Sequence, residues 1–214
     1  MEEQVISRKE IRPLTETMEV INARRSVRKY KNRPVNRATI EQVINAGMMA
    51  PSAINKQPWK FYILTDKEMI RSFDKAIAKV ALKDFSKSGV KGIVQTAGHL
   101  LHAMQNFNLQ AITDPIFHGA PVVIFITAPA KNEWAPLDIG MCAQNIMLAA
   151  KSMGLDTCPV GLAKFVMEVG LYSKLNIPAS EKVLLAIILG YGNEEPVMHE
   201  RIKDRVVFIN LKES

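Results

Sequence analysis

Residues 122–128, VVIFITA, form an uninterrupted apolar run of strand length directly after Pro121. A strand that is apolar on both faces is typical of a sheet covered on both sides, because a strand with one face in water alternates polar and apolar residues. This stretch therefore predicts a sheet with helices packed on both of its faces.

The rest of the chain alternates between helical and extended patterns, without repeats or low-complexity tracts. We expect helices at residues 16–25, after Asn36, at 67–82 and at 138–154, and strands at 60–65, 183–190 and 205–211. Asn36 and Asp138 are expected to be N-caps, and Gly154 to end its helix. The segment from about residue 89 to 118 has no clear period, and helix is the expectation for much of it.

Apolar spacing predicts which side of each helix faces the core. The expected inward residues are Met18, Val20 and Ile21 in the first helix, Ile40, Val43, Ile44 and Met48 in the second, and Ile70, Phe73, Ile77 and Val80 in the third. Taken alone, these patterns indicate an α/β or α+β domain.

Length and composition bound the class of protein. With 214 residues, 48% apolar and 23% charged, the chain fits one domain with a substantial core. Its two cysteines, Cys142 and Cys158, indicate a reducing compartment and no disulfide framework. The polar start does not resemble a signal peptide, and no apolar run approaches the roughly 20 residues that span a bilayer. We expect a cytoplasmic protein with no membrane partner.

The net charge of +7 is a local feature. Between positions 24 and 37 the chain has seven basic residues and no acidic one: Arg24, Arg25, Arg28, Lys29, Lys31, Arg33 and Arg37. Outside this stretch, basic and acidic residues are equal in number.

Three interpretations of this basic stretch stay open. A solvated charged face is the simplest. Nucleic-acid binding is the second, although Tyr30 is the single aromatic residue available for stacking. The third is one phosphate group, on which the guanidinium and hydroxyl groups of Arg24, Arg25, Ser26 and Arg28 could converge.

A second stretch favours the third interpretation. Residues 51–58, PSAINKQP, form a loop bracketed by two prolines and carrying Ser52, Asn55 and Gln57. Hydroxyl and amide groups both donate and accept hydrogen bonds, which suits the edge of a heterocycle. The alternative is an ordinary turn whose polar groups cap neighbouring backbone.

Five stretches together resemble the FMN-dependent nitroreductase family. They are, in order, RRSVRKY, APSAINKQPWKFYIL, GAPVVIFITA, DIGMCAQNIMLAAKSMGLDTCPVG and ILGYG followed by a basic tail. The resemblance runs from about residue 17 to 214, which leaves 1–16 as an N-terminal extension to a single FMN-binding domain. It implies a three-layer α/β (α+β) sandwich, with a mixed sheet flanked by helices, and an intertwined homodimer with two FMN molecules at its interface.

The resemblance also implies cofactor contacts. The FMN phosphate is assigned to Arg24, Arg25, Ser26, Arg28 and Arg201. Flavin contacts from the partner subunit are assigned to Pro51, Ser52, Ala53, Asn55 and Gln57. The segment beside flavin N5, which offers backbone amides, is Pro159, Val160, Gly161 and Leu162. His199 stands where many family members have a second cation, and Phe117 or His118 is expected to line the acceptor pocket.

The implied reaction is ping-pong: NADH or NADPH delivers hydride to flavin N5, and an electron-poor acceptor such as a nitroaromatic or a quinone then takes it. No side chain is required as a catalytic group, and neither a catalytic thiol nor a metal is expected. Alternatives on the same scaffold are a dehalogenase, a flavin-fragmenting enzyme or an azoline oxidase. From a different class, a basic nucleic-acid-binding module stays open, although nucleic acid is not the expected partner.

Overall fold

The computed structural model of the chain describes residues 14–87, 114–202, 205–207 and 209. Its elements, with η for 3-10 helices, are α1 (Glu16–Ala23), α2 (Arg37–Met48), η1 (Ala53–Asn55), β1 (Lys60–Leu64), α3 (Lys67–Lys87), β2 (Val122–Pro129), α6 (Ala135–Ser152), β3 (Asp156–Val160), η2 (Gly161–Glu168), η3 (Tyr172–Leu175) and β4 (Glu181–Gly190). Within these described ranges, no helix is both long and apolar enough to cross a membrane.

The strands form one four-stranded sheet in the order β1-β2-β4-β3. All three strand pairs are antiparallel. In the part of the chain that the structure describes, the parallel component expected of a mixed sheet is one bridge, between Ser26 and Thr157 on β3 at the edge of the sheet. The sheet is therefore antiparallel through its four strands and parallel at this one bridge.

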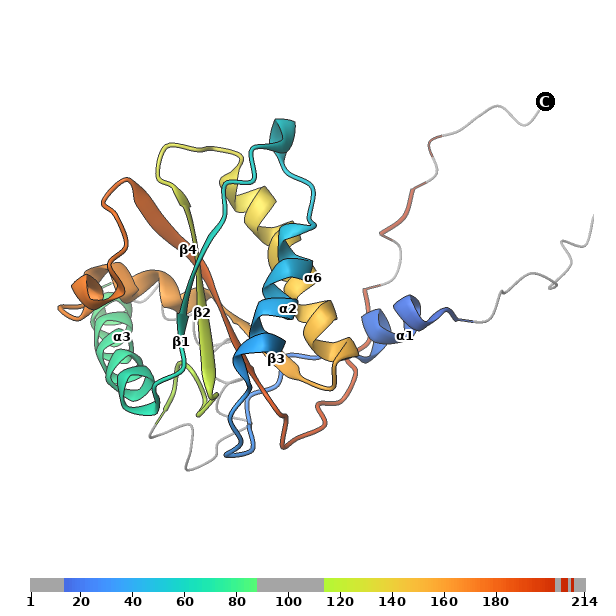
Figure 1. Ribbon diagram of the computed structural model, residues 1–214, viewed down its shortest axis with the longest axis horizontal. Helices are drawn as coiled ribbons and strands as arrows, with labels where there is room; N and C mark the ends of the chain where they lie inside the picture. The colour runs from blue at the N-terminus through green and yellow to red at the C-terminus, as the bar shows by residue number, and fades with distance from the viewer. Residues whose placement is uncertain (1–13, 88–113, 203–204, 208, 210–214) are drawn as a thin grey trace, which may run out of the picture.

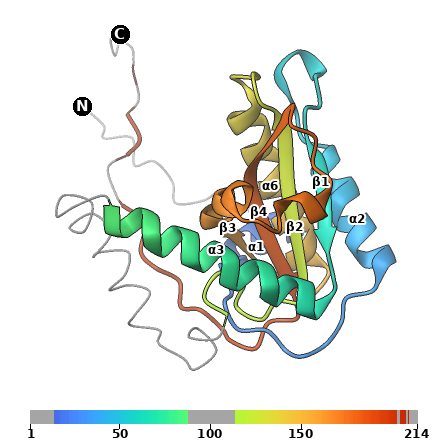
Figure 2. The same cartoon turned by 90° about the vertical axis from the view of Figure 1, so that its left-hand side faces the viewer.

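Helices cover both faces of the sheet, as Figures 1 and 2 show. Along β2, Val122, Ile124 and Ile126 pack in the core shared with α2 and α6. Val123 and Phe125 point the other way, into the core shared with α3 and η2. The sheet covered on both faces, predicted from the run at 122–128, and the α+β sandwich are confirmed.

Helices α2 and α3 lie where the sequence predicts them. The Asn36 side chain accepts a hydrogen bond from the Thr39 N–H, so Asn36 is the N-cap of α2. All but one of the expected inward residues in these two helices are buried or partly buried. They are Ile40, Val43, Ile44, Ile70, Phe73, Ile77 and Val80. The exception is Met48, which is 39% exposed, so its inward assignment was wrong for a single chain.

Helix α6 begins three residues before the predicted start, and Trp134 occupies the N-cap position. Asp138 lies inside the first turn and is buried, and its Oδ1 accepts a hydrogen bond from the Ala53 N–H at 3.1 Å. Asp138 is therefore not an N-cap; it fastens η1 to α6. Gly154 has φ +74°, the left-handed conformation that ends helices, as expected.

Two predictions near the chain ends were wrong. Helix α1 has no buried residue, and Met18 and Ile21 are 44% and 41% exposed. Residues 205–207 and 209 form no strand, and the rest of the strand predicted at 205–211 lies outside the described residues. Described apolar side chains beyond Pro196 are also exposed: Val197, Met198, Ile202, Val206, Val207 and Ile209. In Figure 1, α1 and this C-terminal segment lie outside the three-layer body.

The sequence patterns missed β3, η2 and η3. Strand β3 is short and contains Pro159, which is tolerated because β3 is an edge strand. The helix expected over about 89–118 falls mostly on residues 88–113, outside the described residues. Its last residues form a turn, in which the His118 N–H donates to the Asp114 carbonyl.

Candidate functional site

Residues 24–30, here called the arginine segment, run beside the edge strand β3. Helix α1 ends because Arg24 adopts extended backbone angles, and the segment leaves the helix in that conformation. The Val27 N–H donates to the Thr157 carbonyl at 3.0 Å, next to the Ser26–Thr157 bridge. The arginine segment thus lies directly against the strand that leads into residues 159–162.

Alternate side chains of an extended segment point to opposite sides, so Arg24, Ser26 and Arg28 share one side. All three act on the Cys158 thiol: burial raises its pKa, while the charge of Arg28, a hydrogen bond with Ser26 and the charge of Arg24 oppose that rise. We call Arg24, Ser26 and Arg28 the cation cradle. Two guanidinium groups and one hydroxyl on one side of a segment suit a single phosphate group.

Arg25 lies outside the cation cradle. Its Nη1 donates to the carbonyl oxygens of Asn22, at 2.6 Å, and Arg24, at 2.8 Å. Because helix ends leave carbonyls without partners, this contact makes Arg25 a cap for the end of α1. The structure therefore brings together three of the four arginine-segment residues that the sequence assigns to phosphate.

Several other cations of the basic stretch have partners within the chain. Lys29 Nζ lies 3.7 Å from a Glu194 carboxylate oxygen, and Arg37 Nε lies 2.7 Å from Glu41. The Arg33 guanidinium stacks 3.8 Å from the centre of the Tyr191 ring. Because these cations already have partners within the chain, the basic stretch does not form a uniform cationic face. This weakens the nucleic-acid interpretation.

The segment assigned to flavin N5 begins one residue after Cys158. Val160 is buried, Pro159 and Leu162 are half-buried, and Gly161 is exposed. A Cβ added at Gly161 would meet no atom within 4 Å, so there is open space in front of this backbone. The cation cradle and the 159–162 backbone are therefore neighbours within one chain.

Of the two residues expected in an acceptor pocket, His118 lies near the cation cradle. Burial, together with the charge of Arg28, lowers the pKa of His118 to about 4, so the imidazole is neutral at neutral pH. Phe117 is fully buried and makes an edge-to-face contact with Phe125, at 6.0 Å between ring centres. Phe117 packs in the core of the single chain, and its assignment to the acceptor pocket stays a prediction.

A buried acid holds the turn that carries His118. Asp74 Oδ2 accepts hydrogen bonds from the N–H groups of Ile116, at 2.9 Å, and Phe117, at 2.6 Å. Burial and the neighbouring Asp114 carboxyl raise the pKa of Asp74 to about 8, so this carboxyl keeps a proton at neutral pH. Asp74 was not predicted as a site residue, and the one signal for it was an acid next to Phe73 on the apolar side of α3.

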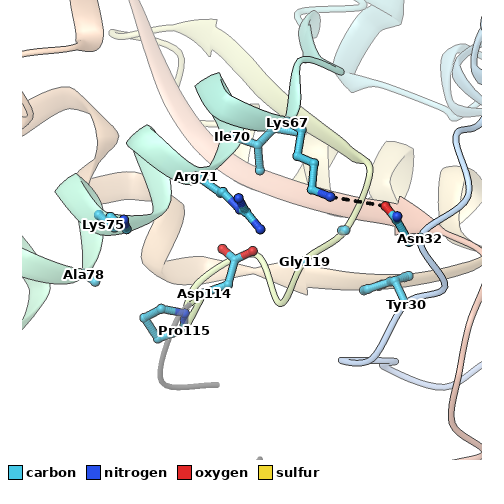
Figure 3. A pocket seen from close by; sticks show the side chains of 11 residues that line it. Tyr30, Asn32, Lys67, Ile70, Arg71, Lys75, Ala78, Asp114, Pro115 and Gly119 are labelled. Atoms are coloured by element: carbon cyan, nitrogen blue, oxygen red, sulfur yellow. Dashed lines mark hydrogen bonds between the residues drawn. The ribbon is translucent and has the colours of Figure 1, made fainter. Parts of the chain in front are cut away.

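A cavity of about 650 Å³ lies between α3 and this turn. Figure 3 shows Lys67 donating to the Asn32 amide oxygen, at 3.3 Å, and the Arg71 guanidinium pointing toward Asp114. Lys75 also lines the cavity, one turn further along the helix. The cavity is also lined by Gly119, the residue after His118, and by Tyr30 of the arginine segment. It therefore lies beside both.

Residues 51–57, here called the proline loop, lie at the other end of α6. The loop is fastened to Asp138 in the first turn of α6, whereas α1 and the arginine segment lie beside the last turns (Figure 1). An 18-residue helix is about 27 Å long, so one chain keeps the two regions apart.

The proline loop has an unusual backbone. Ile54, Asn55 and Gln57 all have positive φ, at 47°, 55° and 44°. Side chains support this shape: the Ser52 hydroxyl accepts from the Gln57 N–H at 2.9 Å, and the Gln57 amide donates to Asn55 Oδ1 at 3.1 Å. Non-glycine residues with positive φ are strained, and such strain is frequent at functional sites.

Arg201 lies in the exposed C-terminal segment. Its Nη1 donates to the His199 carbonyl at 3.0 Å, and among the described residues no contact joins it to the cation cradle. Its assignment to the phosphate stays a prediction.

The fold and the cation cradle describe an α+β protein with a cationic segment along an edge strand. Residues 21–191 match the model of the nitroreductase family, and the chain belongs to that family. It is 27% identical over 212 residues to a chloronitrobenzene nitroreductase of Comamonas testosteroni, covering 88% of this chain and 92% of the relative. It is 28% identical over 196 residues to an NADPH-flavin oxidoreductase of Vibrio harveyi, covering 91% and 73%.

Solved structures share the fold. A nitroreductase with bound FMN from Bacteroides fragilis superposes with a TM-score of 0.71 at 24% identity, covering 92% of this chain and all of that one. A second, also with bound FMN, from Desulfitobacterium hafniense, gives a TM-score of 0.70 at 22% identity, with the same coverage.

Proposed function

We propose that the protein is an FMN-dependent oxidoreductase that passes hydride from NADH or NADPH to an electron-poor acceptor, such as a nitroaromatic or a quinone. The observation that carries this proposal is the position of the cation cradle, directly beside the 159–162 backbone in a chain of the nitroreductase family. The names of the relatives support the same reaction class, since they include nitroaromatic reductases and a flavin oxidoreductase.

The residues present fit FMN. Arg24, Ser26 and Arg28 would hold the phosphate through charge-assisted hydrogen bonds. The backbone at 159–162, with open space in front of Gly161, would lie along the isoalloxazine ring. Arg25 caps α1 in this structure, so we remove it from the proposed phosphate ligands.

The flavin, when bound, supplies the hydride chemistry. The chain supplies binding, orientation and charge. His118 is neutral near neutral pH, so it can orient an acceptor by a hydrogen bond without adding charge. Neither thiol is an activated nucleophile, because burial raises the pKa of Cys158 and raises that of Cys142 to about 12.

The proposed active form is a homodimer with two FMN molecules. The proline loop and the cation cradle lie at opposite ends of α6, so a loop from a second chain is needed to complete one flavin site. The exposed apolar residues of α1 and the C-terminal segment support a large contact between chains. Arg201 and the cytoplasmic location are further parts of this proposal.

The test begins with the absorbance spectrum of the purified protein and chromatography of any chromophore released by heat. We expect a flavin spectrum, FMN as the released compound, and anaerobic bleaching on addition of NADH or NADPH. Adding a nitroaromatic or a quinone should then restore the absorbance. A colourless protein that does not take up added FMN would overturn the proposal.

A further inference from the structure

The chain segment after β4 pairs with the arginine segment. Tyr30 and Gly192 form an antiparallel bridge. On either side of it, the Lys31 N–H donates to the Tyr191 carbonyl and the Asn193 N–H donates to the Lys29 carbonyl, both at 2.8 Å. The C-terminal end of the arginine segment is therefore held by residues 191–193.

The next residue, Glu194, continues this contact through its side chain. One carboxylate oxygen accepts a hydrogen bond from the Arg28 backbone N–H, and the other lies 3.7 Å from Lys29 Nζ. The Glu194 side chain is only 23% exposed. An acid is thus bound to the backbone of a cradle residue.

Glu194 is close enough to influence the whole neighbourhood of Arg28. Its charge acts on the pKa values of Tyr30, His118 and Cys158, the same three groups on which the charge of Arg28 acts. A negative charge in this position repels a phosphate, because both are anions in partly buried surroundings. Its presence there calls for a geometric role that outweighs the repulsion.

We propose that Glu194 is a positioning residue for the FMN phosphate: its carboxylate holds the Arg28 backbone and pairs with Lys29, so that the Arg28 side chain stays on the Ser26 side of the segment. This role rests on the proposed function. The ion pair between Glu194 and Lys29 also keeps the Lys29 side chain away from the cation cradle.

The hydrogen bond and the charge of Glu194 act in opposite directions, and two substitutions separate them. Glu194→Ala removes both, which leaves the Arg28 N–H without its acceptor. Glu194→Gln keeps an oxygen acceptor in the same place and removes the negative charge. Glu195→Gln is the matched control, because it removes the same charge from the next residue, which is exposed.

The experiment is a titration of flavin-free protein with FMN and with riboflavin, which lacks the phosphate, followed by flavin fluorescence. For Glu194→Ala we expect FMN affinity to fall about tenfold, with riboflavin affinity unchanged. Glu194→Gln should bind FMN at least as tightly as the unmodified protein, and Glu195→Gln should stay within about twofold.

Three results would overturn the role of Glu194 while leaving the proposed function intact. They are unchanged FMN affinity in Glu194→Ala, equal losses for FMN and riboflavin, and a loss in Glu194→Gln as large as that in Glu194→Ala. If Glu194→Ala does not fold, Glu194→Gln decides: affinity equal to or above that of the unmodified protein supports the role, and a fall of more than about fivefold overturns it. If the unmodified protein binds neither flavin, the proposed function fails first.

Discussion

The arginine segment and the proline loop both carry polar groups on irregular backbone, but their own chain supports them very differently. The arginine segment is bonded to β3 through Val27 and to residues 191–194 through Arg28 and Lys29. The proline loop has three residues at positive φ, bonds within itself, and a described attachment to the rest of the chain at Asp138. The first region is complete within one chain, whereas the second would be completed by the partner chain of the proposed homodimer.

The largest expected effect is a loss of FMN affinity on substitution in the arginine segment. Arg28→Ala should weaken FMN binding about 100-fold, because it removes one of two guanidinium groups from the phosphate. Arg37→Ala is the matched control: Arg37 belongs to the same basic stretch but pairs with Glu41 on the surface. Isothermal titration with FMN measures both. A loss shared equally by the two variants would mean that total charge, and not the cation cradle, binds the cofactor.

The next effect concerns the proline loop. Asp138→Ala should lower the free energy of unfolding by about 1–3 kcal/mol, because it removes the acceptor of the Ala53 N–H. Asp138→Asn keeps an oxygen acceptor and should lose less. Urea unfolding gives the stability, and an FMN titration of the same variants gives the affinity.

The same pair of variants sharpens the comparison between the regions. The cation cradle is untouched by changes at Asp138, so a fall in FMN affinity would have to come through the proline loop. If stability falls and FMN affinity does not, the proline loop has no part in the flavin site, and the two-chain arrangement loses its main support.

Sequence patterns correctly predicted the elements that follow a regular period or a local capping signal and that pack against the same chain. The run at 122–128, the Asn36 cap and the Gly154 stop depend on local chemistry, and all three were confirmed. Met18 and Ile21 follow a helical period, but a period cannot tell whether the covering surface belongs to the same chain or to another.

The site itself was predictable only where a motif marks it. Arg24, Ser26 and Arg28 lie within five residues of one another, so the sequence places them together. Asp74 and Glu194 act through backbone groups 42 and 166 residues away, and no local pattern marks such contacts. Short strand β3 was missed because its five residues include a proline.

A smaller effect, dependent on pH, concerns the turn beside the arginine segment. The pKa of Asp74 is raised in the folded protein above its ordinary value of 3.8, so its contribution to stability is full below about pH 4 and is lost as the pH rises toward 8. Between pH 5 and 7 this group should lower the free energy of unfolding by about 1 kcal/mol per pH unit. Asp74→Asn should remove that slope, and urea unfolding across the pH range measures it. Parallel pH profiles for the two proteins would contradict the raised pKa of Asp74.

The smallest expected effect separates two adjacent arginines. Arg25→Ala should change FMN affinity by less than about threefold, because the Arg25 guanidinium is bonded to the carbonyls of Asn22 and Arg24 and does not face Cys158. The change should instead appear as a slightly lower free energy of unfolding, from the loss of a cap on α1. FMN titrations of Arg24→Ala and Arg25→Ala, compared directly, test this assignment. Since the two substitutions remove the same charge one residue apart, a large difference between them can only come from the side of the segment on which each arginine lies, and equal losses would return Arg25 to the phosphate.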